Sequence, residues 1–341
     1  MADVTAGPPL LRGRIRTEPG DFEVDEVLGF EPDGHGTHVL LHVEKCGANT
    51  AWVAARLAAH GGIAAHDVGY SGLKDRRAVT RQWFSVPGGG LERWQNVAGE
   101  GYRVLAAHPH TRKLRRGSHR ANRFHLTVRE LTGPLEDLAP RLGAIGQLGV
   151  PNFFGSQRFG RDFGNLQRAR DWAKSGRAPR ERQQRGFALS ATRAILFNKV
   201  LAERVDLGNW NTLLPGEAVL LDGRQSFFAA PIIDEALVAR CNSFDLHPSG
   251  PLHGSGESPA QGVARELEDG VLAREPALMA LLGSEGLRAE RRATRLIVRH
   301  LSWQLDGDVL ELRFELARGS FATTVLGRLI AGVADEMPPI E

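Results

Sequence analysis

Along most of this 341-residue chain, apolar and polar positions follow patterns that are typical of strands or helices. Alternation of apolar and polar positions is typical of a half-buried strand, and apolar residues three or four positions apart are typical of an amphipathic helix. These patterns predict strands within residues 19–27, 38–44, 82–86, 124–129 and 310–316. They predict helices at residues 51–60, 134–148, 166–173 and 190–205, with a final helix that begins near residue 319.

Candidate caps and breakers refine these boundaries. Asn49-Thr50 precedes the helix at residues 51–60, and Gly61-Gly62 follows it. Ser320 is the candidate N-cap of the last helix. Between residues 213 and 284, proline, glycine and serine recur, so we expect this segment to consist mainly of loops.

The composition indicates a globular protein without a membrane anchor. Apolar residues make up 42% of the chain and charged residues 24%, which is typical of globular domains. The net charge is only +3, so a strongly basic surface requires an uneven distribution of charge. Cys46 and Cys241 are too few for a disulfide framework or a zinc site of their own. Because we find neither a signal peptide nor a long apolar run, we expect a cytoplasmic protein.

One acidic residue stands among cations near the middle of the N-terminal half. Asp75 has Lys74, Arg76 and Arg77 as neighbours. Nearby positive charge favours the ionised carboxylate, and such a group suits nucleophilic catalysis or charge stabilisation. A structural ion pair is the other interpretation, and it is the commoner role for clustered charges.

Basic residues are concentrated in two segments. Residues 112–123 hold six Lys or Arg and no acid, and residues 158–193 hold ten against three acids. Dense positive charge is typical of phosphate binding, although a solvated basic face has the same appearance. The candidates for contact with an RNA backbone are Arg112, Lys113, Arg115, Arg116 and Arg120.

Three histidines lie close together in the sequence, at His35, His38 and His42. No acidic or cysteine ligand accompanies them at a recognisable spacing. Exposed histidines on a strand are therefore the favoured interpretation, and we predict no metal site.

Two stretches resemble the signatures of a known family, the TruD-type tRNA pseudouridine synthases. Residues 72–82 match G-x-K-D-x-x-A-x-T-x-Q, and residues 149–160 match G-V-P-N-[YF]-F-G-x-Q-R-F-G. Shorter matches occur at residues 19–26, 45–50, 122–124 and 319–325, so the resemblance extends over nearly the whole chain. Arg16 departs from the family, in which other members carry Lys.

The resemblance implies an α+β fold, with a mixed, mainly antiparallel catalytic sheet and an inserted second α/β domain. It places the catalytic pseudouridine synthase domain at residues 1–158 and 291–341, and the inserted family-specific domain at residues 159–290. The implied activity is that of an isomerase converting uridine to pseudouridine in tRNA, at position 13. The implied reaction uses no cofactor, and tRNA is the expected partner, with no obligate protein partner evident.

The resemblance also implies roles for single residues. Asp75 aligns with the catalytic aspartate of the family. It would act on the ribose, either by attacking C1′ or by taking a ribose proton to give a glycal. The implied substrate-binding residues are Arg16, Lys74, Asn122, Phe124, Gln157 and Arg158. Phe124 would contact the target base while remaining the first core residue of its strand.

Two other functional classes compete with this interpretation. A catalytically silent RNA-binding protein explains the basic segments, but phosphate binding gains nothing from the carboxylate of Asp75. A metal nuclease needs clustered carboxylates, and a glycosidase usually needs a second one. The motif loop supplies only Asp75.

Overall fold

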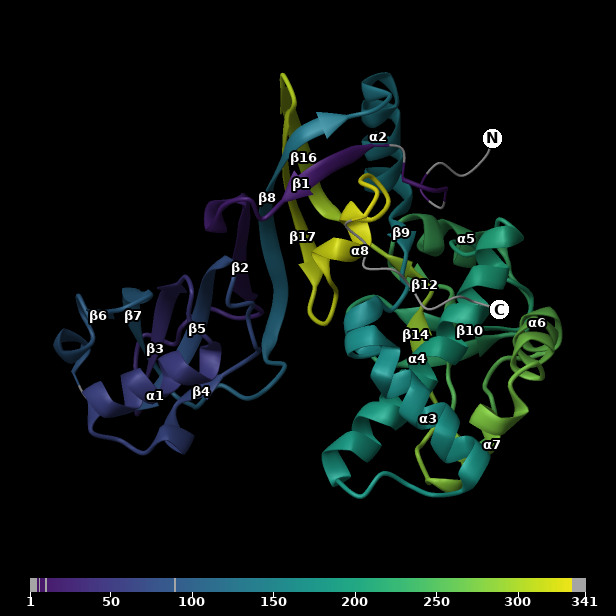
Figure 1. Cartoon of the computed structure of the whole chain (residues 1–341), viewed down its shortest axis with the longest axis horizontal. Helices are drawn as coiled ribbons and strands as arrows, with labels where there is room; N and C mark the ends of the chain where they lie inside the picture. The colour runs from purple at the N-terminus through teal and green to yellow at the C-terminus, as the bar shows by residue number, and fades with distance from the viewer. Residues whose placement is uncertain (1–4, 6, 10, 89, 333–341) are drawn as a thin grey trace. The chain divides into compact units, whose positions relative to one another are not determined.

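The computed structural model describes residues 5, 7–9, 11–88 and 90–332. The chain forms two compact units (Figure 1). The sheet unit consists of residues 12–133 and 298–320, and the helix-rich unit consists of residues 134–297 with the described parts of residues 1–11 and 321–341. Both units therefore combine segments that are far apart in the sequence. The predicted functional division at residues 158 and 290 is a separate question and stays a prediction.

Ten of the described strands form one sheet in the sheet unit. The strand order is β16-β17-β8-β2-β5-β3-β7-β6, with β1 paired to β8 and β4 paired to β5. The β2–β5 pair is parallel and the other pairs are antiparallel, which confirms the predicted mixed, mainly antiparallel α+β fold. The strands are β1 (Arg12–Ile15), β2 (Phe22–Leu28), β3 (His38–Lys45), β4 (Gly69–Tyr70), β5 (Val79–Pro87), β6 (Ala98–Gly99), β7 (Tyr102–His110), β8 (His119–Thr132), β16 (Arg299–Asp306) and β17 (Val309–Ala317).

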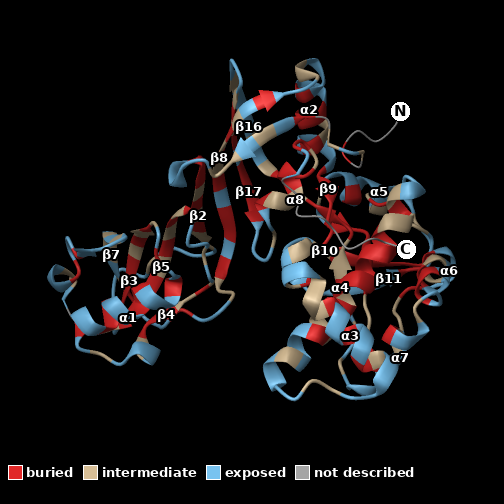
Figure 2. Cartoon of the chain, in the orientation of Figure 1, coloured by how far each residue is buried: buried red, intermediate tan, exposed pale blue. Residues whose placement is uncertain are grey.

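Helix α1 (Thr50–Gly61) packs its apolar side against strands β3 and β5. Val53 and Leu57 are fully buried in this layer together with Phe84 of β5. The buried side of the helix is visible in Figure 2. The predicted helix and its caps are confirmed, since Asn49 is the N-cap and Gly62 ends the helix in the left-handed conformation at φ 58°.

Strand β8 is the long central strand of this sheet and pairs with β1, β2 and β17. Phe124, Leu126 and Val128 are buried, whereas Arg123 and His125 between them are more exposed. The predicted alternation is therefore confirmed. The strand begins at His119, several residues before the alternating segment, and its first part leads out of the basic loop at residues 111–118.

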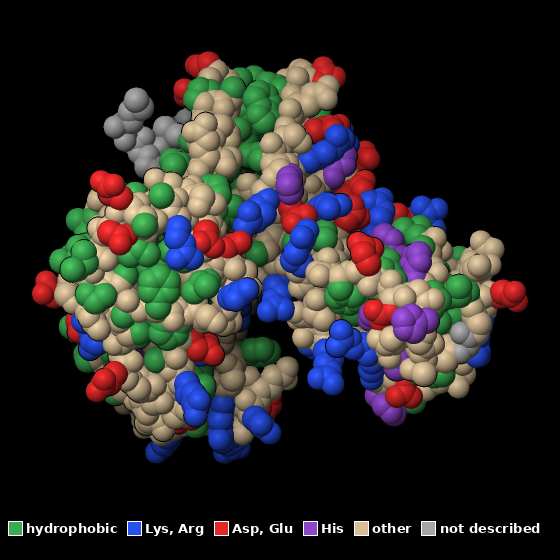
Figure 3. Space-filling model, turned by 180° about the vertical axis from the view of Figure 1, so that it is seen from behind, with side chains coloured by type: hydrophobic (Ala, Val, Ile, Leu, Met, Phe, Trp, Pro, Cys, Tyr) green, Lys and Arg blue, Asp and Glu red, His purple; other side chains and the backbone are tan. Residues whose placement is uncertain are grey.

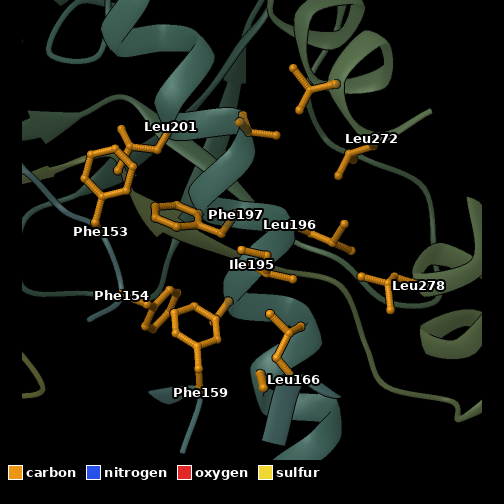
Figure 4. Close-up of a cluster of buried hydrophobic side chains, with 14 of the residues drawn as sticks. Phe153, Phe154, Phe159, Leu166, Ile195, Leu196, Phe197, Leu201, Leu272 and Leu278 are labelled. Carbon is orange, nitrogen blue, oxygen red and sulfur yellow. The ribbon is translucent and has the colours of Figure 1, made fainter. Parts of the chain in front are cut away.

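The helix-rich unit is organised around the 25-residue helix α4. Figure 4 shows phenylalanines and aliphatic side chains from α4 and its neighbours packed into one cluster, which includes Phe154, Ile195 and Phe197. The helices are α2 (Leu138–Leu148), α3 (Gly164–Ser175), α4 (Arg182–Asp206), α5 (Glu235–Asn242), α6 (Gly262–Leu272), α7 (Pro276–Ser284) and α8 (Ala322–Leu326). The strands are β9 (Val150–Pro151), β10 (Glu217–Leu221), β11 (Phe227–Ala230), β12 (Leu246–His247), β13 (Ser249–Leu252), β14 (Glu290–Ala293) and β15 (Arg295–Leu296).

Two local predictions are wrong. The segment from residue 213 to residue 284 contains the short elements β10 to β13 and α5 to α7 in addition to loops. Its glycines and prolines lie partly inside strands: Gly250 and Pro251 belong to β13. The N-cap of α8 is Phe321 and not Ser320, because the Ser320 N–H closes a turn onto the Ala317 carbonyl before the helix begins.

A buried ion pair inside the helix-rich unit gives the first prediction. Arg291 and Glu268 are joined by two hydrogen bonds of 2.6 and 2.9 Å, and their side chains are 2% and 3% exposed. Glu268→Ala leaves the guanidinium buried without its carboxylate, so we expect the free energy of unfolding to fall by about 3–5 kcal/mol. Urea denaturation measures this, with the exposed Glu266→Ala on the same helix as control. An equal effect of both substitutions would contradict the expectation.

Candidate active site

Asp75 lies in the loop between β4 and β5, with its side chain 41% exposed. Its Oδ1 accepts a hydrogen bond from the Arg77 backbone N–H at 3.0 Å, and its Oδ2 lies 3.1 Å from Nη2 of Arg16. The carboxylate therefore has one local backbone donor and one cationic partner, and it remains accessible to solvent.

Lys45 fixes the backbone of this loop from beneath. The residue is only 1% exposed, and its Nζ donates to the carbonyl oxygens of Asp75 at 2.9 Å, Ala48 at 3.0 Å and Lys74 at 3.4 Å. Burial lowers the pKa of Lys45 to about 8, with Asp75 acting in the opposite direction and Lys74 adding to the decrease. One ammonium group thus joins residues 45–48 to the segment that carries the candidate carboxylate.

Two polar side chains complete this support. Thr50 Oγ1 accepts from the Lys74 N–H at 3.0 Å and donates to Gln82 Oε1 at 2.9 Å. Gln82 Nε2 donates to the Gly72 carbonyl at 3.0 Å. Thr50 is 2% exposed and Gln82 fully buried, so the loop backbone is fixed at Gly72, Lys74 and Asp75.

The Lys74 side chain forms an ion pair with Glu26, whereas the neighbouring Asp75 pairs with Arg16. Its Nζ lies 2.6 Å from Glu26 Oε2, and the two side chains are 7% and 0% exposed. Burial raises the pKa of Glu26, and the Lys74 ammonium partly offsets this effect. The predicted substrate contact of Lys74 stays a prediction, and what the structure adds is this buried pair beneath the loop.

Aromatic rings lie beside the Arg16–Asp75 pair. The Arg16 guanidinium is 4.3 Å from the centroid of the Phe22 ring, and Phe22 packs edge-on against Phe124 at 6.3 Å. Asn122 is 8% exposed. Among the described residues, Arg16 Nε and Asn122 Oδ1 are buried without a hydrogen-bond partner. Predicted residues Arg16, Asn122 and Phe124 thus lie in the same unit as Asp75.

His119 is a residue of this region that the sequence patterns do not indicate. It is 7% exposed, and a Cβ added at Gly72 would lie 3.4 Å from its ring and 3.6 Å from Lys74 Nζ. Burial, with Lys74 and Arg318 nearby, lowers the pKa of His119 to about 4. Its ring is therefore neutral near pH 7, and its Nδ1 finds no partner in the described part of the chain.

The basic loop at residues 111–118 is attached directly to the candidate loop. The Gly117 N–H donates to the Ser71 carbonyl at 2.7 Å, and the Ser71 and Ser118 hydroxyls are 2.8 Å apart. Buried Leu114 anchors the basic loop through Ser85. The five predicted backbone-contact residues, Arg112, Lys113, Arg115, Arg116 and Arg120, are all exposed.

These five cations differ in their partners. Arg116 stacks over Tyr70 at 4.1 Å, and Lys113 donates to the His66 carbonyl. Arg120 lies 3.2 Å from Glu315, which also binds Arg123. Within the described ranges, Arg112 and Arg115 have neither an ion pair nor a side-chain hydrogen bond.

Gln157 and Arg158 belong to the helix-rich unit, at the short helical turn η5 (Ser156–Arg158). Both are exposed and line an open cavity of about 350 Å³ together with Phe154, Asn165 and Phe187. Arg158 Nη1 donates to Ser190 Oγ at 3.1 Å. Phe153 and Phe154 are buried in the core of this unit.

Two features are missing from the part of the chain that the structure describes. None of its helices has the length and apolar character needed to cross a membrane. Nor do three or more His, Cys, Asp or Glu side chains come together in a way that would hold a metal ion. Of the three neighbouring histidines, His42 stacks on Trp83 at 4.6 Å.

Comparisons with known proteins agree with one another. A family model described as tRNA pseudouridine synthase D (TruD) matches residues 4–166 and 163–329. The tRNA pseudouridine synthase D of Nitrosococcus oceani is 47% identical over 328 residues, covering 95% of this chain and 92% of that protein. The protein of the same name from Azotobacter vinelandii is 44% identical, covering 92% and 91%.

A solved structure gives the corresponding likeness in three dimensions. It is described as a putative tRNA pseudouridine synthase D from Methanosarcina mazei, and it superposes with a TM-score of 0.74. The match covers 95% of this chain and 94% of that one, at 20% sequence identity. At this identity the likeness establishes the fold.

The environment of Lys45 gives a prediction about pH. Between pH 8 and its ordinary pKa of 10.5, the unfolded chain retains a proton on Lys45 that the folded chain has released. The free energy of unfolding should therefore rise with pH in this window for the wild type relative to Lys45→Met. Urea denaturation across the window measures this difference, with exposed Lys113→Met as the control that shows no such slope. A difference independent of pH would contradict the buried position of Lys45.

Proposed function

Because the chain belongs to the TruD family of tRNA pseudouridine synthases, isomerases that convert uridine to pseudouridine in tRNA, we propose that Asp75 is its catalytic residue. The proposed target is the uridine at position 13, as the resemblance in the motifs implies. The proposed compartment is the cytoplasm. The observation that carries the catalytic assignment is the accessible Asp75 carboxylate on a loop whose backbone is fixed by three buried side chains.

Fixing the loop backbone matters because catalysis depends on a small range of productive geometries. Lys45 binds the carbonyl of Asp75 itself, so the backbone position of Asp75 does not depend on contacts made by its own side chain. A solvated surface ion pair needs no such support. The buried lysine therefore favours the catalytic interpretation of Asp75 over the structural one.

The reaction replaces the N1–C1′ bond of uridine by a C5–C1′ bond. A proton leaves C5 and one is gained at N1, so product and substrate are isomers. Asp75 serves either route to this exchange: its carboxylate attacks C1′, as glycosidase carboxylates do, or it removes a ribose proton to give a glycal. In both routes the detached uracil turns within the site before C5 bonds to C1′.

The uridine must first leave its base stack, which costs a few kcal/mol. Aromatic rings that face an extruded base offset part of this cost. Phe124 and Phe22 are the rings beside Arg16 and Asp75 in the sheet unit. The unpartnered polar atoms of Asn122 and Arg16 suit the donors and acceptors on the edge of uracil or on the ribose.

The basic loop at residues 111–118 is proposed to bind the phosphates of the RNA backbone. Arg112 and Arg115 are the principal candidates, because their side chains have no competing partner within the described ranges. Arg120 shares the carboxylate of Glu315, so its net contribution to phosphate binding should be smaller. Gln157 and Arg158 are proposed to contact the RNA from the helix-rich unit.

The test measures pseudouridine in unmodified tRNA after incubation with wild type, Asp75→Ala and the control Asp67→Ala. Asp67 has a comparable exposure of 44% in the same unit, so it controls for loss of a surface carboxylate. We expect modification by the wild type and Asp67→Ala, none by Asp75→Ala, and similar tRNA affinity for all three.

Two outcomes would contradict the proposal. Modification by Asp75→Ala would show that the catalytic assignment is wrong. If none of the proteins modifies tRNA but all bind it, the chain is a silent RNA-binding protein.

A further inference from the structure

A second concentration of positive charge lies in the helix-rich unit, at the C-terminal part of α3, the first turn of α4 and the connection between them. Residues 170–185 contain six Lys or Arg and two acids, which gives a net charge of +4. The whole chain has a net charge of +3, so the rest of the sequence is slightly negative. We call this region the α3–α4 surface, defined by Arg170, Lys174, Arg177, Arg180, Arg182 and Arg185.

The cations of the α3–α4 surface are exposed and available. All six residues are exposed, and within the described ranges none forms an ion pair with a carboxylate. Other surface arginines of the same unit do: Arg240 lies 2.6 Å from Asp245, and Arg265 lies 2.5 Å from Asp269. Uncompensated charges close together repel one another, and a bound polyanion removes this repulsion.

The scaffold beneath this surface is preformed. Ala169 and Trp172 of α3 pack against Ala188 of α4 in a buried cluster. Arg185 Nε donates to the Pro179 carbonyl at 2.6 Å, which ties α4 to the connection. Figure 3 shows Lys and Arg side chains gathered at the lower end of this unit, where Figure 1 shows α3 and its connection to α4. Binding at this surface therefore requires little ordering of the backbone.

The neighbouring cavity indicates which polyanion fits. Asn165 of α3 and Phe187 and Ser190 of α4 line the 350 Å³ cavity described above, and Phe187 is 49% exposed. Exposed aromatic rings beside cations are the usual means of holding RNA, because bases stack on the rings while the cations contact phosphates. An acidic protein or an anionic membrane has no bases to place there.

We propose that the α3–α4 surface binds phosphates of the substrate tRNA outside the stem that carries the target uridine. This inference rests on the proposed function for the identity of the RNA, and it adds a second binding surface to the basic loop of the sheet unit. The sheet unit then selects and modifies the nucleotide, and the α3–α4 surface supplies affinity for the rest of the molecule.

The test compares two triple variants with equal charge changes. R170Q/K174Q/R177Q neutralises the α3–α4 surface, and R240Q/R265Q/R274Q neutralises ion-paired arginines of the same unit. Dissociation constants are measured over a range of salt concentrations for unmodified full-length tRNA and for a short stem-loop that contains the target uridine. Pseudouridine formation at saturating RNA is measured in parallel.

For the first variant, we expect the dissociation constant of full-length tRNA to rise on the order of tenfold, with a salt dependence shallower by about two counterions. Its affinity for the stem-loop and its rate at saturating RNA should match the wild type. The control variant should differ from the wild type by less than about twofold for both RNAs, because its arginines are already neutralised by carboxylates. The charge-keeping variant R170K/R177K should bind as the wild type does.

Unchanged affinity and salt dependence for full-length tRNA would overturn the inference. So would equal losses for the two RNAs, or equal losses in the two triple variants. Failure of the proposed function is distinguishable, since it appears as absence of pseudouridine in the wild-type reaction with either RNA.

Discussion

The buried Lys45 ammonium, together with Thr50 and Gln82, holds the loop of the candidate active site in place. The Lys45 Nζ donates to three backbone carbonyls, among them that of Asp75. A buried lysine is costly without such partners, and burial lowers its pKa to about 8. Here the cost is offset by the hydrogen bonds to these three carbonyl groups. The same contacts fix the backbone of the loop that carries Asp75, the proposed catalytic residue.

The sheet explains why this lysine reaches the loop. Lys45 ends β3, and β3 is hydrogen-bonded to β5, the strand that follows the loop. β5 also runs parallel to β2, which supplies Glu26 as the partner of Lys74. The loop before β5 is therefore supported from two neighbouring strands and from Thr50 at the start of α1. Helix α1 packs against β3 and β5, and β8 pairs with β2, so the supporting strands are themselves held by buried contacts.

Much of this arrangement can be predicted from the sequence. The strand at residues 124–129 and the helix at residues 51–60 are predicted from the local periodicity of apolar residues. Both elements are confirmed, as β8 and α1. The sequence also indicates the candidate carboxylate, because Asp75 stands among cations in a recognisable motif. Patterns of this kind can be recognised in a single sequence because they depend on residues that are close together in the chain.

The rest depends on contacts between distant segments. Burial of Lys45 and Glu26 and the neutral state of His119 follow from residues that are far away in the sequence, so no local pattern reveals them. The prediction that residues 213–284 consist mainly of loops is wrong for the same reason, because it interpreted each glycine as a loop residue. Gly250 lies inside β13, where a Cβ would approach the Phe197 ring to 3.0 Å, so that glycine serves close packing instead of a loop.

The most direct test of this account is the single-turnover rate of pseudouridine formation by Lys45→Met, measured with tRNA affinity and compared with Lys113→Met. If Lys45 positions Asp75, its loss should reduce the rate on the order of a hundredfold while the affinity for tRNA stays close to that of the wild type. Lys113→Met, on the exposed basic loop, should instead weaken binding and leave the rate at saturation unchanged. An unchanged rate in a folded Lys45→Met protein would contradict the central role given to this residue.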